Sequence, residues 1–151
     1  MLRNLMVLMS TVLLFCAVFC RFSSASDQFK EPFITLPHHY SQFDVHMGWN
    51  VTTDSTGTSI EGIIQNVRYA QMEQIEIWVS AVAADGKPIS RTTSFVMPQR
   101  LNMGDMTSFS LKLPVAAIVG TKLIFTYKYE GSDGGDDGGV IRWMQSFDSA
   151  M

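Results

Sequence analysis

The stretch Lys122–Glu130, which reads KLIFTYKYE, decides the fold class. Its apolar and aromatic residues, Leu123, Phe125, Tyr127 and Tyr129, occupy every second position, and most of the residues between them are polar. Because successive side chains of a β-strand point to opposite faces, this alternation predicts a strand with one face on a core and the other toward solvent.

The same two-residue period recurs on both sides of this stretch, from Val45 to Phe147. No window of helical length after the N-terminal segment shows a convincing 3.6-residue period. Short strands separated by turn residues such as Asp85-Gly86 are typical of two packed antiparallel sheets. We therefore predict an all-β, immunoglobulin-like antiparallel β-sandwich of about seven strands, with a small closed barrel as the alternative. The expected strands lie near residues 45–51, 60–66, 75–83, 88–96, 107–113, 122–130 and 141–147.

One of these strands differs from the others in composition. The segment Pro88–Val96 is polar on both faces, with Ser90, Arg91 and Thr92 in succession. A strand with little apolar surface to bury, and with a proline at its start, belongs at the edge of a sheet. We expect it there, where it could also add an extended segment of a partner.

Residues 1–25 have the pattern of a secretory signal peptide. Arg3 precedes the apolar run Leu5–Cys20, and small residues follow up to Ala25. The run has 16 residues, fewer than the roughly 20 that a membrane-spanning helix needs. We expect cleavage after Ala25. The alternative is an uncleaved signal anchor, which would be the chain's attachment to a membrane.

Removal of this segment changes the composition of the chain. Both cysteines of the 151 residues, Cys16 and Cys20, belong to it, so the mature protein has no thiol chemistry and no zinc–thiolate site. Loss of Arg3 and Arg21 leaves nine basic against 14 acidic residues. This acidic balance argues against a nucleic-acid partner. We expect an exported protein, periplasmic or extracellular, with an extended arm at 26–44 and the sandwich at 45–151.

The strand end Gly62-Ile63-Ile64-Gln65-Asn66 is similar to the G-x-V-x-N motif of FxLYD-type domains. These domains are a family of exported bacterial immunoglobulin-like sandwiches, and the order of the turn and core motifs in this chain resembles theirs. Leu101 and Gly104 followed by Phe109 are similar to the family's L-x-P-G-x-x-x-x-F segment, and Asp85 is the residue kept from the naming motif. The resemblance implies an exported sandwich and supplies no catalytic residue.

Two clusters of polar residues are candidate metal sites. His38, His39 and His46 offer imidazoles to Zn²⁺ or Cu²⁺, although adjacent residues of an extended arm point to opposite faces. In the Gly-rich loop 131–139, the carboxylates of Asp133, Asp136 and Asp137 suit Ca²⁺. Solvated side chains are the favoured interpretation of both clusters, so no cofactor is expected. The same holds for a copper site at three methionines around one loop, Met97, Met103 and Met106.

Trp78 is the candidate for contact with a partner. It falls on the face of its strand opposite to Ile75, Ile77 and Val79, together with Val82. No cysteine, G-x-S-x-G elbow or Ser–His–Asp arrangement indicates an enzyme. The sequence predicts an exported, non-catalytic sandwich with a structural or protein-interaction role in the cell envelope. A metal-binding envelope protein that uses the histidine arm or the Asp-rich loop is the alternative.

Overall fold

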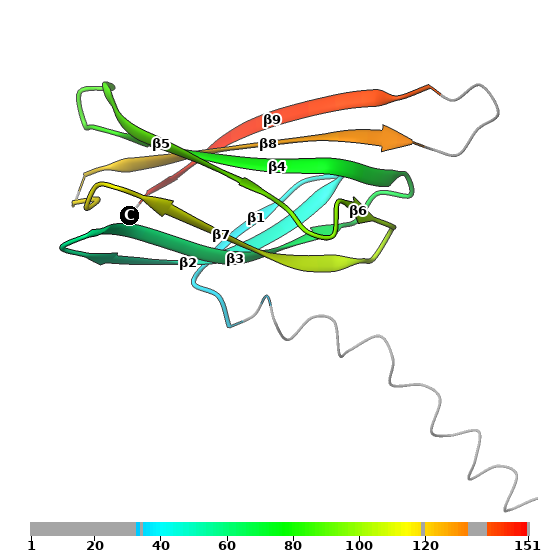
Figure 1. Cartoon of the computed structure of the whole chain (residues 1–151), viewed down its shortest axis with the longest axis horizontal. Coiled ribbons are helices and arrows are strands. Elements are labelled where there is room, and N and C mark those ends of the chain that lie inside the picture. The colour runs from blue at the N-terminus through cyan, green and yellow to red at the C-terminus, as the bar shows by residue number, and fades with distance from the viewer. Residues whose placement is uncertain (1–32, 34, 119, 133–138, 151) are drawn as a thin grey trace, which may run out of the picture. The chain divides into compact units, whose positions relative to one another are not determined.

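The computed structural model describes residues 33, 35–118, 120–132 and 139–150, and residues 35–151 form one compact unit. The predicted signal peptide at 1–25 and the three aspartates of the Gly-rich loop lie outside the described residues. Nine antiparallel strands are described (Figure 1). They are β1 (His38–Ser41), β2 (Val45–Asp54), β3 (Gly57–Asn66), β4 (Gln71–Val82), β5 (Pro88–Phe95), β6 (Arg100–Leu101), β7 (Met106–Leu113), β8 (Lys122–Ser132) and β9 (Ile141–Ala150).

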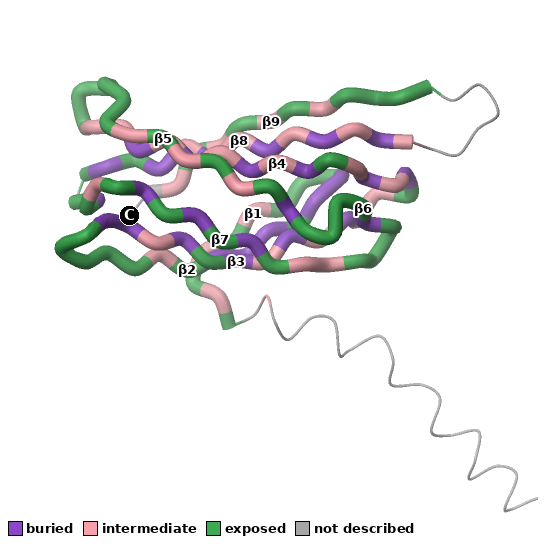
Figure 2. Tube along the Cα trace, in the orientation of Figure 1, coloured by how far each residue is buried: buried purple, intermediate pink, exposed green. Residues whose placement is uncertain are grey.

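The strands form two sheets packed face to face, which confirms the predicted immunoglobulin-like sandwich. The first sheet has the order β1-β2-β3-β7, and the second has the order β5-β4-β8-β9, with β6 paired to one end of β4. Buried and half-buried residues alternate along most of β4 and β8, as Figure 2 shows. The stretch Lys122–Glu130 lies in β8, at an interior position of the second sheet.

Aromatic side chains from both sheets fill the core between them. Trp49 of β2 is 2% exposed, and its ring centroid lies 4.7 Å from that of Phe125 in β8. Phe147 of β9 stacks on Phe125 at 5.2 Å. Gly62 makes room for this packing, because a Cβ there would lie 2.4 Å from the carbonyl oxygen of Gly48. The core positions expected from the alternation in Lys122–Glu130 are buried: Leu123, Phe125, Tyr127 and Tyr129. Ile141, which the same alternation places on the core face of its strand, is 38% exposed.

The N-terminal arm contributes one strand to the sandwich. β1 pairs with β2, with His38 opposite Trp49 and Ser41 opposite His46. Tyr40 of β1 stacks on Phe147 of β9 at a centroid distance of 3.7 Å, and so links the edges of the two sheets. The structured part of the sandwich thus begins before Val45, within the arm expected at 26–44.

β4 also differs from expectation at both ends. It begins at Gln71 and ends at Val82, and its register with β8 shifts between Glu73 and Glu76. Gln74 within this bulge has a φ of 51°. The extra residues change the alternation, which is why the sequence pattern indicates a strand only from Ile75. By contrast, the expected edge strand is confirmed as β5, which pairs with β4 alone.

Candidate functional site

The outer face of the second sheet carries the most distinctive surface of the described residues. Register aligns its outward side chains in rows across the strands. In one row, Glu76 of β4 lies opposite Phe95 of β5 and Lys128 of β8, and Lys128 lies opposite Met144 of β9. We call this surface the Trp78 face; its outward residues are Glu76, Trp78, Ser80, Val82, Arg91, Thr93, Phe95, Ile124, Thr126, Lys128, Met144 and Ser146.

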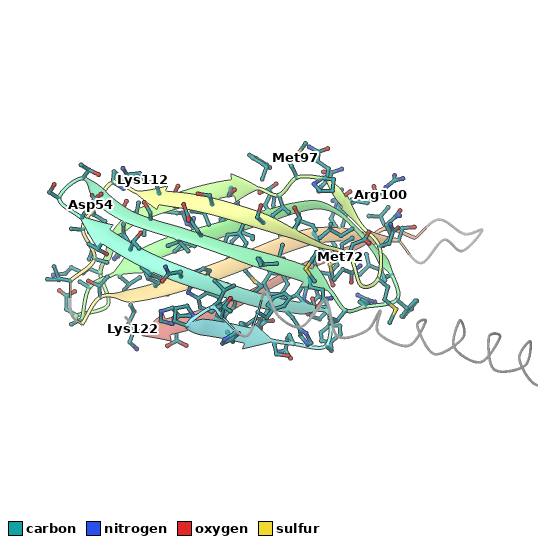
Figure 3. All side chains as sticks on the ribbon, turned by 90° about the horizontal axis from the view of Figure 1, so that it is seen from below. Asp54, Met72, Met97, Arg100, Lys112 and Lys122 are labelled. Atoms are coloured by element: carbon teal, nitrogen blue, oxygen red, sulfur yellow. The ribbon has the colours of Figure 1, made fainter. Side chains whose placement is uncertain are left out.

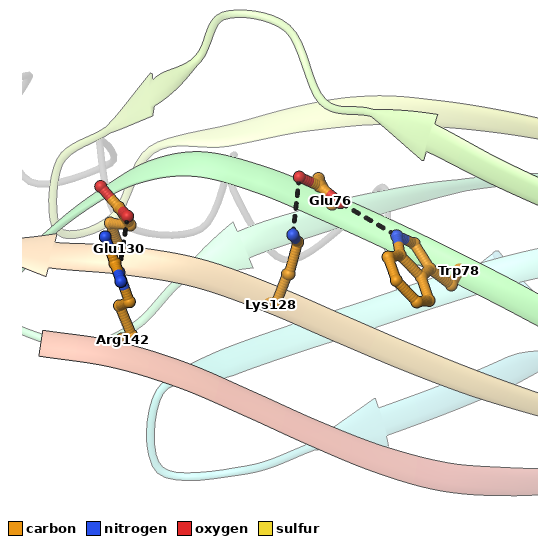
Figure 4. A network of polar contacts seen from close by, with 5 residues as sticks. All are labelled: Glu76, Trp78, Lys128, Glu130 and Arg142. Carbon is orange, nitrogen blue, oxygen red and sulfur yellow. Dashed lines mark hydrogen bonds and ion pairs between the residues drawn. The ribbon is translucent and has the colours of Figure 1, made fainter.

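Trp78 is held at the centre of this face by its neighbours (Figure 4). Its indole Nε1 donates a hydrogen bond of 3.0 Å to Oε2 of Glu76, and the other oxygen of Glu76 pairs with Nζ of Lys128 at 2.9 Å. The guanidinium of Arg91 lies 4.8 Å from the centroid of the Trp78 ring, and Nζ of Lys128 lies 5.5 Å from it. Both distances are in the range of cation–π contacts, so the indole is fixed in position.

A second ion pair lies beside this cluster. Nε of Arg142 in β9 bonds Oε1 of Glu130 in β8 at 2.9 Å, and Figure 4 shows the pair next to Lys128 and Glu76. A groove of about 340 Å³ lies among these residues and Met144. The charged groups that line it are therefore already neutralised by one another.

Apolar side chains are exposed on the same face. Phe95 and Met144 are each 66% exposed, at the two ends of one row. Val82 of β4 is half-buried. The sequence-based candidates Trp78 and Val82 thus lie on one face of β4, with apolar groups on both flanking sides.

The outer face of the first sheet has a different chemistry. Two of its rows align only polar side chains: Asn50, Glu61 and Ser110 in one, and Thr52, Ser59 and Lys112 in the next. Aromatic and sulfur-containing side chains are absent from these two rows. The other rows add the half-buried Ile63 and Met106 to polar residues and glycine. Figure 3 shows the side chains on the ribbon, with Lys112 labelled on β7. The sandwich is asymmetric, because one outer face is predominantly polar and the other combines aromatic, aliphatic and charged groups.

The three histidines are not brought together. His38 lies on the inner side of β1, where its ring stacks against Trp49 at 5.7 Å. His39 and His46 are on the outer side, and both are exposed. Met97 and Met103 are each 63% exposed. Within the described ranges, no group of three or more His, Cys, Asp or Glu residues is arranged to hold a metal ion.

Asp44, which the sequence places among the histidines, has another role. It is fully buried and accepts hydrogen bonds from the hydroxyls of Tyr127, at 2.9 Å, and Tyr129, at 3.0 Å. Arg68 donates to the hydroxyl of Tyr129 at 3.4 Å. Burial and the charge of Asp44 raise the pKa of Tyr127. Burial raises the pKa of Tyr129 to about 12 although the guanidinium of Arg68 opposes the shift. This cluster bonds the two sheets together.

The sequence analysis missed the partners of Trp78. Glu76 could have been recognised from the sequence, because it lies two residues before Trp78 and residues two apart in a strand point to the same face. Arg91 and Lys128 come from neighbouring strands, and their proximity depends on a register that the sequence does not state. Among the described residues, no helix is long and apolar enough to cross a membrane.

No family model matches the sequence, and no curated protein matches it. Among solved structures, the GAE domain of GGA2p from Saccharomyces cerevisiae has a TM-score of 0.44 at 8% identity, over 74% of this chain and 96% of that one. The yeast GGA1 GAE domain has a TM-score of 0.42 at 10% identity, over 74% and 97%. A β-glucuronidase of glycoside hydrolase family 2 has a TM-score of 0.36 at 12% identity, over 66% of this chain and 11% of that one. These likenesses concern the fold and say nothing of what this chain binds.

Proposed function

We propose that the protein is an exported, non-catalytic protein-interaction module of the cell envelope, and that the Trp78 face is its recognition surface. The observation that carries the proposal is the contrast between the two outer faces of the sandwich. One bears mostly polar groups, and the other presents a fixed indole flanked by Phe95 and Met144, each 66% exposed. Aromatic residues, methionine and arginine are enriched where proteins meet.

The fixed geometry of Trp78 favours recognition over mere solubility. A side chain that is already immobilised loses little conformational entropy on binding. The carboxylate of Glu76 and the ammonium of Lys128 already bond each other at 2.9 Å, so the partner need not supply a counter-charge for either. Tryptophan and arginine, both present here, are the residues that most often dominate the energy of an interface.

Export is supported by the pattern of residues 1–25, with a basic start, an apolar run and small residues up to Ala25. The cysteine-free mature chain would depend on its core for stability, and 19 buried hydrophobic residues form one cluster. A metal-binding role has no comparable support in the described residues, because the histidines lie on both faces of the first sheet.

Photo-crosslinking from defined positions tests the proposal. A photoreactive amino acid at Phe95 should give a discrete adduct with another protein in the native envelope. The same group at Ser110, on the outer face of the first sheet, serves as the matched control and should give none. Adducts of equal yield from both positions, or from neither, would overturn the assignment of the Trp78 face.

A further inference from the structure

The outer edge of β9 is an open edge of the second sheet within the described part of the chain. β9 is the last strand in the order of the second sheet, and no strand in the described part of the chain pairs with its far side. All ten of its residues pair with β8 without a register shift, from Ala150 opposite Lys122 to Ile141 opposite Gly131. A long regular edge presents hydrogen-bonding groups of the backbone to any other strand.

The other sheet edges carry features that hinder pairing. β1 has four residues. β5 begins at Pro88, and its register with β4 shifts between Ala81 and Val82. The edge of β7 is next to the segment that follows β5. The hydroxyl of Thr107 in β7 donates a hydrogen bond to the carbonyl of Met97 in that segment. Short length, proline and irregular register are among the devices by which edges avoid other chains. β9 has none of these three, and its exposed charges, Arg142 and Asp148, are of opposite sign.

The sequence of β9, IRWMQSFDSA, is complementary to itself in the antiparallel direction. With a two-fold axis at Gln145, Arg142 of one copy lies opposite Asp148 of the other, and the axis generates this pair twice. The same register places Trp143 opposite Phe147, also twice. Directly opposite residues of antiparallel strands point to the same face, with their Cβ atoms within contact distance.

Both kinds of pair have surface left for a second copy. The side chain of Arg142 remains 83% exposed while it bonds Glu130, and that of Asp148 remains 72% exposed at 3.9 Å from Lys122. Trp143 and Phe147 are only partly buried against the core, so a neighbouring strand would cover them further.

We propose that β9 is a self-association edge, at which two copies of this chain pair antiparallel about a two-fold axis at Gln145. The second sheets of the two copies then form one continuous sheet. Arg142–Asp148 pairs fix the register on its outer side, and Trp143–Phe147 contacts extend the core on its inner side. This inference is independent of the recognition role of the Trp78 face.

Charge reversal and mixing test the proposal on protein produced from the full-length sequence. Arg142→Asp places aspartate against Asp148 in both pairs, and Asp148→Arg places arginine against Arg142. Each variant alone should self-associate about tenfold more weakly than the wild type, because like charges directly opposite destabilise strand pairing. An equimolar mixture of the two variants should recover the dimer. In a mixed dimer one copy carries aspartate at both positions and the other carries arginine at both, so each of the two pairs again joins opposite charges.

Sedimentation velocity over a range of concentrations is the readout, with unfolding curves to verify that each variant is folded. Arg100→Asp makes the same charge change in β6, where Arg100 is also exposed and paired with a glutamate, Glu73, and this variant should dimerise as the wild type does. A wild-type monomer at about 100 μM, a micromolar-range limit for specific association, would overturn the proposal. So would single variants that dimerise as the wild type does, or a mixture that stays monomeric.

Hydrogen exchange on the wild type provides a measurement that needs no variant. The backbone amides of β9 that point away from β8 should exchange more slowly as the protein concentration rises. Exchange independent of concentration would contradict pairing at this edge.

Discussion

The hydroxyl of Tyr127 donates a hydrogen bond of 2.9 Å to the carboxylate of Asp44, 83 residues earlier in the chain. Tyr127 belongs to β8 in the second sheet, and Asp44 immediately precedes β2 in the first. Tyr129 donates to the same carboxylate. The sandwich is therefore closed at this place by a buried polar cluster, in addition to its apolar core.

Removal of the Asp44 carboxylate should destabilise the fold. Asp44→Ala leaves the buried hydroxyls of Tyr127 and Tyr129 without their acceptor, and each unsatisfied buried group costs about 1–3 kcal/mol. We expect a loss of about 3 kcal/mol in the free energy of unfolding, measured with urea. Asp44→Asn keeps one acceptor oxygen and should lose less. Asp85→Ala, in an exposed turn, is the control, and an equal effect of the two alanine variants would contradict this role.

Stability should fall at alkaline pH. In the unfolded chain both tyrosines ionise near the ordinary pKa of about 10, whereas in the folded protein the pKa of Tyr129 is about 12 and that of Tyr127 is also raised. Their contribution is thus complete below pH 10 and is lost as the pH rises through the folded pKa values. Between pH 10 and 12 the folded protein keeps up to two protons that the unfolded chain has lost. The free energy of unfolding should therefore fall by up to about 2.7 kcal/mol per pH unit in this range.

Urea unfolding at several pH values measures this slope, and Tyr127→Phe should reduce it by about half because one titrating group is gone. A slope that the variant does not change would show that other groups control the alkaline transition.

The local alternation of residues was enough to predict the strands that are regular. KLIFTYKYE became β8 with the expected side chains inside, and the polar segment from Pro88 became the edge strand β5. The start of β4 was missed because the bulge between Glu73 and Glu76 interrupts the two-residue period. β1 has only four residues, too few to establish a period.

The candidate site was less accessible to sequence reasoning, because its contacts are not local. Trp78 was singled out by its position on the polar face, but Arg91 and Lys128 reach it only through the register of three strands. Asp44 is near the histidines in sequence, yet it contacts tyrosines that are 83 and 85 residues away. A local pattern shows which face a residue occupies and cannot show what faces it from another strand.

Gly62 should tolerate no side chain. A Cβ there would lie 2.4 Å from the carbonyl oxygen of Gly48 and 2.6 Å from Cζ of Phe109. Gly62→Ala should lower the free energy of unfolding by about 2–3 kcal/mol, as overpacking in a tight core does. Gly139→Ala is the matched control, since a Cβ at Gly139 would meet nothing within 4 Å. Equal stability of the two variants would contradict the close packing of β2 against β3.

The contact between Arg91 and Trp78 should be measurable as a coupling energy. A double-mutant cycle with Arg91→Ala and Trp78→Ala should give about 0.5–1 kcal/mol, the range of cation–π contacts near a surface. Lys112→Ala in a cycle with Trp78→Ala is the control, because Lys112 lies in the first sheet and bonds Thr56, and distant sites without shared partners give additive effects. A coupling of zero would mean that the guanidinium of Arg91 does not hold the indole at the 4.8 Å of the structure.

Hydroxyl-radical footprinting tests the recognition role of the Trp78 face most directly. Phe95 is 66% exposed on that face, and Tyr69 is 71% exposed outside it, so the two aromatic rings should react comparably in the purified protein. In the native envelope we expect Phe95 to be protected several-fold while Tyr69 reacts as before. Because Phe95 lies in β5, at the opposite edge of its sheet from β9, pairing through β9 would not protect it. Equal reactivity of Phe95 in both settings would contradict the account.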